Sequence, residues 1–264
     1  MTRILEGIGQ QVVGWLANSW RLMEFSFELG AASVSFFGRQ GFRAVLRVVL
    51  EQVYFTGLQA LPFLGLLSLL LGFTVIIQSL PQLQGVGANA LIGKILVISI
   101  VRELGPIITA MVVITRSGSA MAAEMATQRV TGQVEALEAM GVNISLYLVV
   151  PRLFGCMISL FCMILYFDVI ALVGGFLVAS IRLTMPFTLY LDYIYQSLSS
   201  LDLYISLCKG MLFGAVIALF TCYHGLRAQR AAFEIPMYSR SGVVQAMFFV
   251  FVSSAVISAL FYWI

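Results

Sequence analysis

Five apolar stretches, each long enough to cross a bilayer, constrain the fold of this chain more than any other feature. A helix needs about 20 apolar residues to cross a hydrocarbon core of ~30 Å. The stretches lie at about residues 55–80, 90–115, 147–181, 206–226 and 242–264. Only 10% of the residues are charged, whereas soluble domains carry about 25%. The sequence therefore predicts an all-α integral membrane protein with about five transmembrane helices.

The distribution of Lys and Arg indicates how these spans are oriented. The loops after the first and third spans hold only Lys94, Arg182 and Lys209. Because cytoplasmic loops carry an excess of Lys and Arg, we expect a cytoplasmic N-terminus and Ile264 on the outer side. Most basic residues precede the first span or follow the second and fourth spans: Arg3, Arg21, Arg39, Arg43, Arg47, Arg116, Arg129, Arg152, Arg227, Arg230 and Arg240.

Residues 1–50 form an N-terminal region that differs from the transmembrane domain predicted at 51–264. Apolar side chains recur there at spacings of three and four, with polar residues between them. This periodicity is typical of an amphipathic helix in the membrane interface; a helix packed on the other spans is the alternative. The apolar residues concerned are Leu5, Ile8, Val12, Val13, Leu16, Trp20, Met23 and Phe27.

Arg102 and Glu103 lie about ten residues into the second stretch, or ~15 Å at 1.5 Å per residue. Each ionisable group at that depth costs about 2.5–3.5 kcal/mol on insertion scales. Adjacent helical residues point about 100° apart, so the two side chains need other partners. Asp168, a second copy of the chain or a lipid phosphate could pair with Arg102. Two roles are open for Arg102 and Glu103: a structural ion pair and a polar contact in a cavity. Pro106, three residues after Glu103, would kink or widen the helix.

Small residues follow Arg116 and allow helices to approach closely, either in a dimer or within one chain. Gly210 and Gly214 form a GxxxG motif that we expect to serve packing within the chain. The small residues after Arg116 are Ser117, Gly118, Ser119, Ala120, Ala122 and Ala123.

A short amphipathic helix is predicted near residues 131–142, in a loop assigned to the cytoplasm. One face carries Val134, Leu137, Met140 and Gly141, and the other carries Glu135 and Glu138. Such a helix has little apolar surface to bury alone, so we expect it to insert into a groove on a partner protein. A helix lying on the lipid surface is the alternative.

The sequence offers no catalytic or metal-binding constellation. There is no G-x-x-x-x-G-K-[ST] phosphate loop, and Gly93-Lys94 is an isolated pair. His224 is the sole histidine, and the four cysteines have no C-x-x-C spacing. We therefore expect a chain that is not itself an enzyme, with no metal, cofactor or nucleic acid.

Three ordered motifs between Arg102 and Arg152 resemble those of a known family. They are RELGP at 102–106, R-x-GSA-x-x-AE at 116–124 and Q-x-x-A-L-x-x-M-G-V at 133–142, followed by Pro151-Arg152. On these motifs the chain resembles the permease subunits of the MlaE/YrbE family.

The resemblance implies an ABC-transporter permease in the bacterial cytoplasmic (inner) membrane. It implies a homodimer with two copies of a separate ATPase, which binds ATP and Mg, and with an MCE-domain protein on the periplasmic side. The implied substrates are lipids, phospholipids in most Gram-negative systems and sterols in some actinobacterial relatives. By position, Gln133 to Gly141 would be the coupling helix that enters the ATPase groove.

A lipid path needs apolar walls and a few polar groups at the level of the headgroup. Arg102, Glu103 and Gln78 are the predicted polar contacts, and Phe73, Ile77 and Leu104 the predicted acyl-chain contacts. The alternative function is a channel or a proton-coupled carrier that uses Arg102, Glu103 and Asp168 as a relay. A membrane-embedded lipid enzyme is disfavoured, because no acid, base and nucleophile cluster together.

Overall fold

The computed structural model describes residues 42–86, 91–183, 185–228 and 231–263. Within these ranges every regular element is a helix. The amphipathic helix predicted from Leu5 to Phe27 lies outside the described residues. The boundary predicted at residue 50 falls inside the first described helix, α2.

Five helical segments are long and apolar enough to cross a membrane, which confirms the predicted fold class: Leu46–Pro81, Gly93–Val130, Ser145–Arg182, Ser200–Leu226 and Ile235–Phe261. The first covers most of α2 (Phe42–Thr56), the short 3-10 helix η1 (Leu58–Ala60) and most of α3 (Leu61–Val86). The second covers most of α4 (Leu91–Leu96) and all of η2 (Val97–Leu104), α5 (Gly105–Val113), η3 (Ile114–Gly118) and α6 (Ser119–Val130).

The remaining elements connect and complete the other three spans. They are α7 (Gln133–Ala139), η4 (Ser145–Val149), α8 (Val150–Leu183), α9 (Phe187–Ser197), α10 (Ser200–Leu226), η5 (Ala232–Glu234) and α11 (Ile235–Trp263). η2, η3 and η4 are π-helical, and η5 is a 3-10 helix. The third span, which the sequence makes unusually long, is one helix of 34 residues preceded by η4.

Besides the first span, which begins at Leu46 rather than near residue 55, two spans begin earlier than hydropathy predicts. The fourth begins at Ser200 rather than near residue 206, because Ser199 and Asp202 form a capping box at its start. The fifth begins at Ile235 rather than near residue 242. In both cases helical structure continues past the apolar stretch into polar residues.

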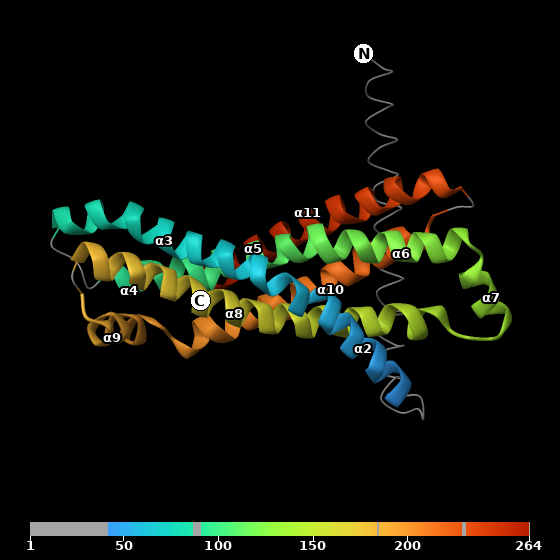
Figure 1. Ribbon diagram of the computed structural model, residues 1–264, viewed down its shortest axis with the longest axis horizontal. Coiled ribbons are helices and arrows are strands. Elements are labelled where there is room, and N and C mark those ends of the chain that lie inside the picture. Colours follow the sequence, from blue (N-terminus) through green and yellow to red (C-terminus); the bar gives the residue numbers. More distant parts are fainter. Residues whose placement is uncertain (1–41, 87–90, 184, 229–230, 264) are drawn as a thin grey trace, which may run out of the picture.

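The long helices run side by side, with α8 packed against α2, α3 and α10. Figure 1 shows α7 at one end of the bundle and α4 and α9 at the opposite end. The main core joins residues of α3, α5, α8, α10 and α11. A second, smaller core lies under α7 and contains Val49, Met125, Val134, Leu148, Val149, Val150 and Cys222.

Close helix contacts depend on a few glycines. A Cβ at Gly72 of α3 would collide with the carbonyl of Ala171 in α8, and one at Gly174 of α8 would collide with that of Leu69. Between α10 and α8, a Cβ at Gly214 would lie 2.7 Å from the Cα of Met157. These backbone-to-backbone contacts explain why small residues occur at the crossings.

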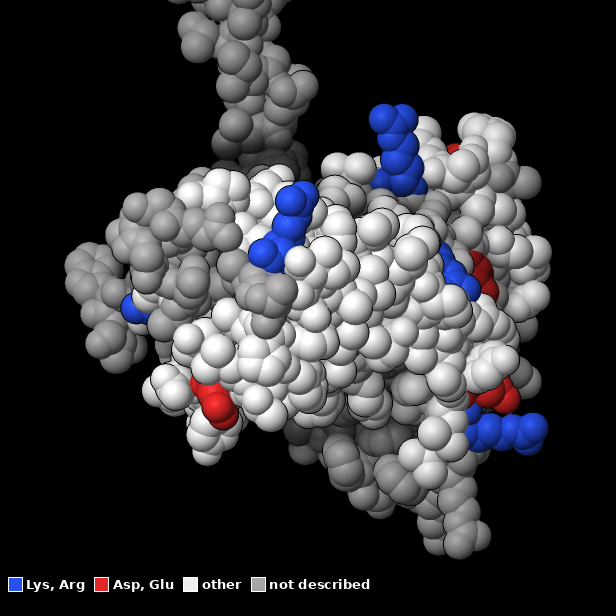
Figure 2. Space-filling view, turned by 60° about the vertical axis from the view of Figure 1, so that its left-hand side comes forward, with Lys and Arg blue, Asp and Glu red and all other residues white. Residues whose placement is uncertain are grey.

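The outer surface of the bundle is largely apolar. Large side chains such as Phe63, Leu66, Val169 and Ile181 are exposed. On the face in Figure 2 the charged side chains of the described residues occur only singly or in small groups among uncharged ones. Such a surface suits contact with lipid tails.

The two glycines of the GxxxG motif should differ in their tolerance of a methyl group. Gly214→Ala would press against the backbone of Met157, whereas a Cβ at Gly210 first meets the flexible end of Ile164, at 2.5 Å. We expect Gly214→Ala to lower the thermal unfolding midpoint of the detergent-purified protein by about 3–10 °C, from an overpacking cost of about 1–3 kcal/mol. Gly210→Ala should cause a clearly smaller shift. Equal shifts would contradict the assigned contacts.

Candidate functional site

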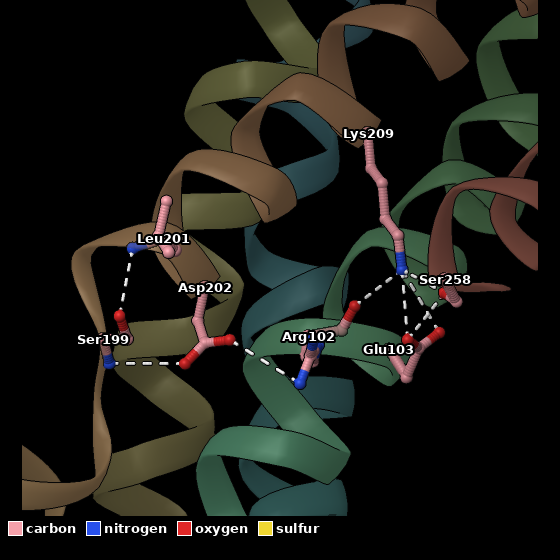
Figure 3. A network of polar contacts seen from close by, with 7 residues as sticks. All are labelled: Arg102, Glu103, Ser199, Leu201, Asp202, Lys209 and Ser258. Atoms are coloured by element: carbon pink, nitrogen blue, oxygen red, sulfur yellow. Dashed lines mark hydrogen bonds and ion pairs between the residues drawn. The ribbon is translucent and has the colours of Figure 1, made fainter. Parts of the chain in front are cut away.

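A buried lysine forms the centre of a polar cluster within the spans. The Lys209 side chain, on α10, is 0% exposed. Its Nζ donates to the Ser258 Oγ of α11 at 2.8 Å and lies 3.2 Å from both carboxylate oxygens of Glu103 in η2. Ser258 Oγ in turn donates to Glu103 Oε1 at 2.7 Å. The cluster thus joins three spans around one ammonium group (Figure 3).

The third partner of Lys209 follows from the Gly-Pro sequence after Glu103. Pro106 has no backbone N–H, so it cannot donate to the carbonyl of Arg102 four residues earlier. That carbonyl accepts a hydrogen bond from Lys209 Nζ at 2.9 Å. An ammonium group has three donors, and all three are used by Ser258, Glu103 and the Arg102 backbone. The proline therefore exposes a main-chain acceptor that the lysine fills.

The Arg102 side chain points to a different partner. Its Nη1 lies 3.8 Å from Asp202 Oδ1, and both side chains are mostly buried. The other carboxylate oxygen of Asp202 accepts from the Ser199 backbone N–H at 3.3 Å, which caps α10 (Figure 3). Arg102 and Glu103 therefore have separate partners, as the 100° between adjacent helical positions predicts.

The candidate pair of Arg102 with Asp168 does not form in the structure. Asp168 is buried in α8, and neither of its carboxylate oxygens has a hydrogen-bond partner among the described residues. It faces the start of α5, where a Cβ at Gly105 would collide with Oδ1. The prediction was wrong because Asp202 and Lys209 were assigned to a loop, whereas the early start of α10 brings both into the bundle.

The predicted lipid-contact residues fall in two places. Arg102, Glu103 and the half-buried Leu104 belong to η2. Phe73, Ile77 and Gln78 are exposed on α3. The hydrogen bonds described above direct Glu103 toward α10 and α11, whereas the three α3 side chains lie on the outer side of their helix.

The helix predicted near 131–142 is present as α7 and is bounded by two glycines. Gly132 and Gly141 have φ values of +75° and +74°, a backbone conformation that glycine adopts without strain. After the helix, Gly141 N–H donates to the Glu138 carbonyl at 2.9 Å, and Val142 N–H to that of Leu137 at 3.0 Å. This pair of bonds is a Schellman motif, which fixes where α7 ends.

The apolar face of α7 is partly used within the chain. Val134 is 1% exposed, and Leu137 packs against the same small core beneath the helix. Met140 remains 70% exposed. Glu135 and Glu138 lie 3.3 and 4.0 Å from Arg129 Nη1. A partner would therefore meet Met140 and the acidic side of α7, while Val134 and Leu137 hold the helix in place.

Sequence reasoning missed Lys209, Asp202 and Ser258. A lysine inside an otherwise apolar stretch is a signal of the same kind as Arg102 and Glu103. The sequence assigns Lys209 to the outer loop, because it lies only three residues inside the predicted start of the fourth apolar stretch, near residue 206. Ser258 carries no such signal, since serines are common in membrane helices and bond to their own helix backbone.

The Glu103–Lys209 pair should behave as one unit in stability measurements. Glu103→Leu would leave the enclosed Lys209 ammonium without its counter-charge, which costs about 3–5 kcal/mol for a buried pair. The double variant Glu103→Leu with Lys209→Met removes both charges and should recover most of that loss. Chemical unfolding of the purified protein measures the difference. As a control, Arg47→Gln should cost less than about 1 kcal/mol, because its ion pair with Glu51 is exposed. Additive losses in the double variant would contradict the pairing.

Comparisons with known proteins agree with this architecture. The family model "Permease MlaE" matches residues 49–260. A probable ABC transporter permease protein of Rickettsia felis is 30% identical over 94% of this chain and 98% of its own length. A similarly named protein of Synechocystis is 30% identical over 82% of this chain and 82% of its own. The chloroplastic protein TRIGALACTOSYLDIACYLGLYCEROL 1 of Arabidopsis thaliana is 28% identical over 82% of this chain and 62% of its own. The chain therefore belongs to the MlaE permease family.

Proposed function

We propose that this chain is the transmembrane subunit of an ABC transporter that moves lipids, with phospholipids as the substrate class, between the cytoplasmic membrane and a periplasmic MCE-domain carrier. ATP would be bound and hydrolysed with Mg by a separate ATPase. The observation that carries the proposal is the helical segment Gly93–Val130, which holds Arg102 and Glu103 at membrane depth and leads directly to α7 outside the spans.

The combination of polar and apolar groups supports a lipid substrate. Arg102 presents a guanidinium, which matches the geometry of a phosphate oxygen pair. Its separation of 3.8 Å from Asp202 is longer than a direct hydrogen bond, so a phosphate could compete for it. Phe73 and Ile77 on α3 supply exposed apolar surface for acyl chains. One relative of this chain also carries the name of a galactosylated diacylglycerol lipid.

The position and capping of α7 support its role as the coupling helix. It lies at the end of the bundle opposite α4 and α9 (Figure 1). Its glycine-bounded turns fix its position, and the exposed Met140 offers one apolar anchor flanked by Glu135 and Glu138. An ATPase groove with an apolar pocket and basic rim would fit this surface.

The exposure of α11 supports a homodimer. Only 17% of its most apolar window is buried, the lowest share of the five spans. A shallow groove between α6 and α11 is lined by Ser119, Ala120, Ala123, Ile235, Pro236, Ser239, Arg240 and Val243. By contrast, Ser117, Gly118 and Ala122 are buried within the chain. A second copy would bury this groove and the outer face of α11.

Met140 should control attachment of the ATPase. Met140→Glu places a charge in the proposed apolar contact, which is costly to bury, and Met140 has no core role to lose. We expect co-purifying ATPase to fall at least tenfold, while the permease stays folded and dimeric. Native mass spectrometry of the purified complex counts both subunits, with two copies of each expected. Leu201→Glu, at an equally exposed apolar position in the first turn of α10, is the control. Full retention of the ATPase in Met140→Glu would reject α7 as the main contact.

Arg102 should affect transport more than assembly. Arg102→Gln removes a charge-assisted contact of about 1.5–3 kcal/mol, so ATP-driven transfer of a fluorescent phospholipid between vesicles should fall about tenfold or more. Subunit ratio and basal ATP hydrolysis should stay within about twofold of wild type. Arg182→Gln, near the end of α8, is the matched control. Normal transfer by Arg102→Gln would exclude a headgroup role for this side chain.

A further inference from the structure

A second amphipathic pocket opens on the side of the bundle, away from the cluster around Lys209. It lies between α2 with η1 on one side and η3 with α6 on the other, and its volume is about 390 Å³. That is within the range of small-molecule sites, roughly 300–1,000 Å³. Its polar lining comes from Gln52, Thr56, Gln59, Arg116, Ser117 and Glu124.

The depth of this pocket differs from that of the Lys209 cluster. Arg116 follows Glu103 along the same helical segment, about 20 Å further at 1.5 Å per residue. Glu103 itself lies about 15 Å from the start of the span at Gly93. Together these distances come to about 35 Å, which exceeds the ~30 Å thickness of the hydrocarbon core. Arg116 therefore lies at the headgroup level of the leaflet farther from Gly93.

The polar side of the pocket has unused hydrogen-bonding capacity. Arg116 is exposed, and Nη2 donates to Gln59 Oε1 at 3.2 Å. A guanidinium has five N–H donors, and Arg116 has no ion pair among the described residues. Thr56 is 1% exposed, and its Oγ1 has no hydrogen-bond partner in the described part of the chain. A buried hydroxyl without a partner is unfavourable.

The charge and the apolar lining narrow the choice of ligand. Glu124 also lines the pocket, but its Oε1 is 2.7 Å from Nη2 of the buried Arg152, which compensates its charge. Arg116 therefore leaves the pocket with a net positive charge. Phe55 and Met121 line the same pocket, and the exposed Leu58 continues the apolar surface beside it.

We infer that this pocket binds the phosphate of a glycerophospholipid from the adjacent leaflet, with Arg116 on the phosphate and Thr56 donating its hydroxyl. The acyl chains would leave along Phe55 and Leu58. The inference rests on the proposed function only in taking a membrane lipid as the occupant. It gives the transporter two phosphate-binding levels, one near the middle of the membrane at Arg102 and one at the headgroup level at Arg116.

Photolabelling of the purified full-length chain with its co-purifying subunits tests the inference without ATP, so that its outcome is independent of transport. The probe is a phosphatidylglycerol with a diazirine near the acyl carbonyl, and the comparison probe is the matching diacylglycerol, which lacks phosphate. We expect the first probe to label peptides that contain Phe55 or Met121, and the second to label them at least tenfold less. Arg116→Gln should reduce the phosphatidylglycerol signal about tenfold, since it removes the charged contact.

Two further variants keep the test decisive. Arg47→Gln removes an exposed arginine of the neighbouring α2 surface that does not line the pocket, and it should leave labelling unchanged. Thr56→Val keeps the shape of a side chain that makes no hydrogen bond within the described residues, and it should reduce labelling severalfold even if Arg116→Gln fails to assemble. Equal labelling by both probes, or unchanged labelling in Thr56→Val and any assembled Arg116→Gln, would overturn the inference. Full protection by millimolar inorganic phosphate would assign the site to free phosphate and overturn the lipid as its occupant.

Discussion

The enclosed ammonium of Lys209 is the interaction on which the arrangement of the spans depends. An isolated charge inside a low-dielectric bundle is strongly unfavourable unless it is paired and hydrogen-bonded. Lys209 meets this requirement only where η2, α10 and α11 come together, because its three partners come from η2 and α11. Any large displacement of one of these helices would leave the ammonium with an unsatisfied donor. The cluster therefore fixes the mutual position of three spans.

The Gly-Pro sequence of the second span makes this cluster possible. Pro106 removes one donor from the helix, and the eight residues before Gly105 are π-helical. A π-helical turn contains an extra residue and frequently marks a functional site. Gly105 then allows α5 to approach Asp168 on α8 without a Cβ in the way. The same short motif thus supplies a carbonyl for Lys209, widens the helix beside Arg102 and Glu103, and permits close packing on the opposite side.

Hydropathy predicted the five spans and the all-helical fold, because burial in a bilayer demands long apolar helices with internal hydrogen bonds. The motif residues predicted α7 as a separate short helix. The sequence did not predict which residues Arg102 and Val134 contact. The pairing of Arg102 with Asp202 depends on a capping box that starts α10 before its apolar residues. The burial of Val134 depends on side chains from α2 and α8 that are distant in sequence. Both are tertiary effects that periodicity within one helix does not report.

The burial of Val134 changes how α7 can act on the spans. A coupling helix that gave its whole apolar face to a partner would be only loosely attached to its own chain. Here Val134 packs in one small core with Val49 of α2, Val150 of α8 and Cys222 of α10. Cys222 lies on the same helix as Lys209, about 20 Å away at 1.5 Å per residue. A displacement of α7 would therefore act through packed side chains on α10, and α10 carries the lysine that joins the spans. Contiguous packing of this kind would provide a physical connection between the proposed ATPase contact and the proposed membrane site.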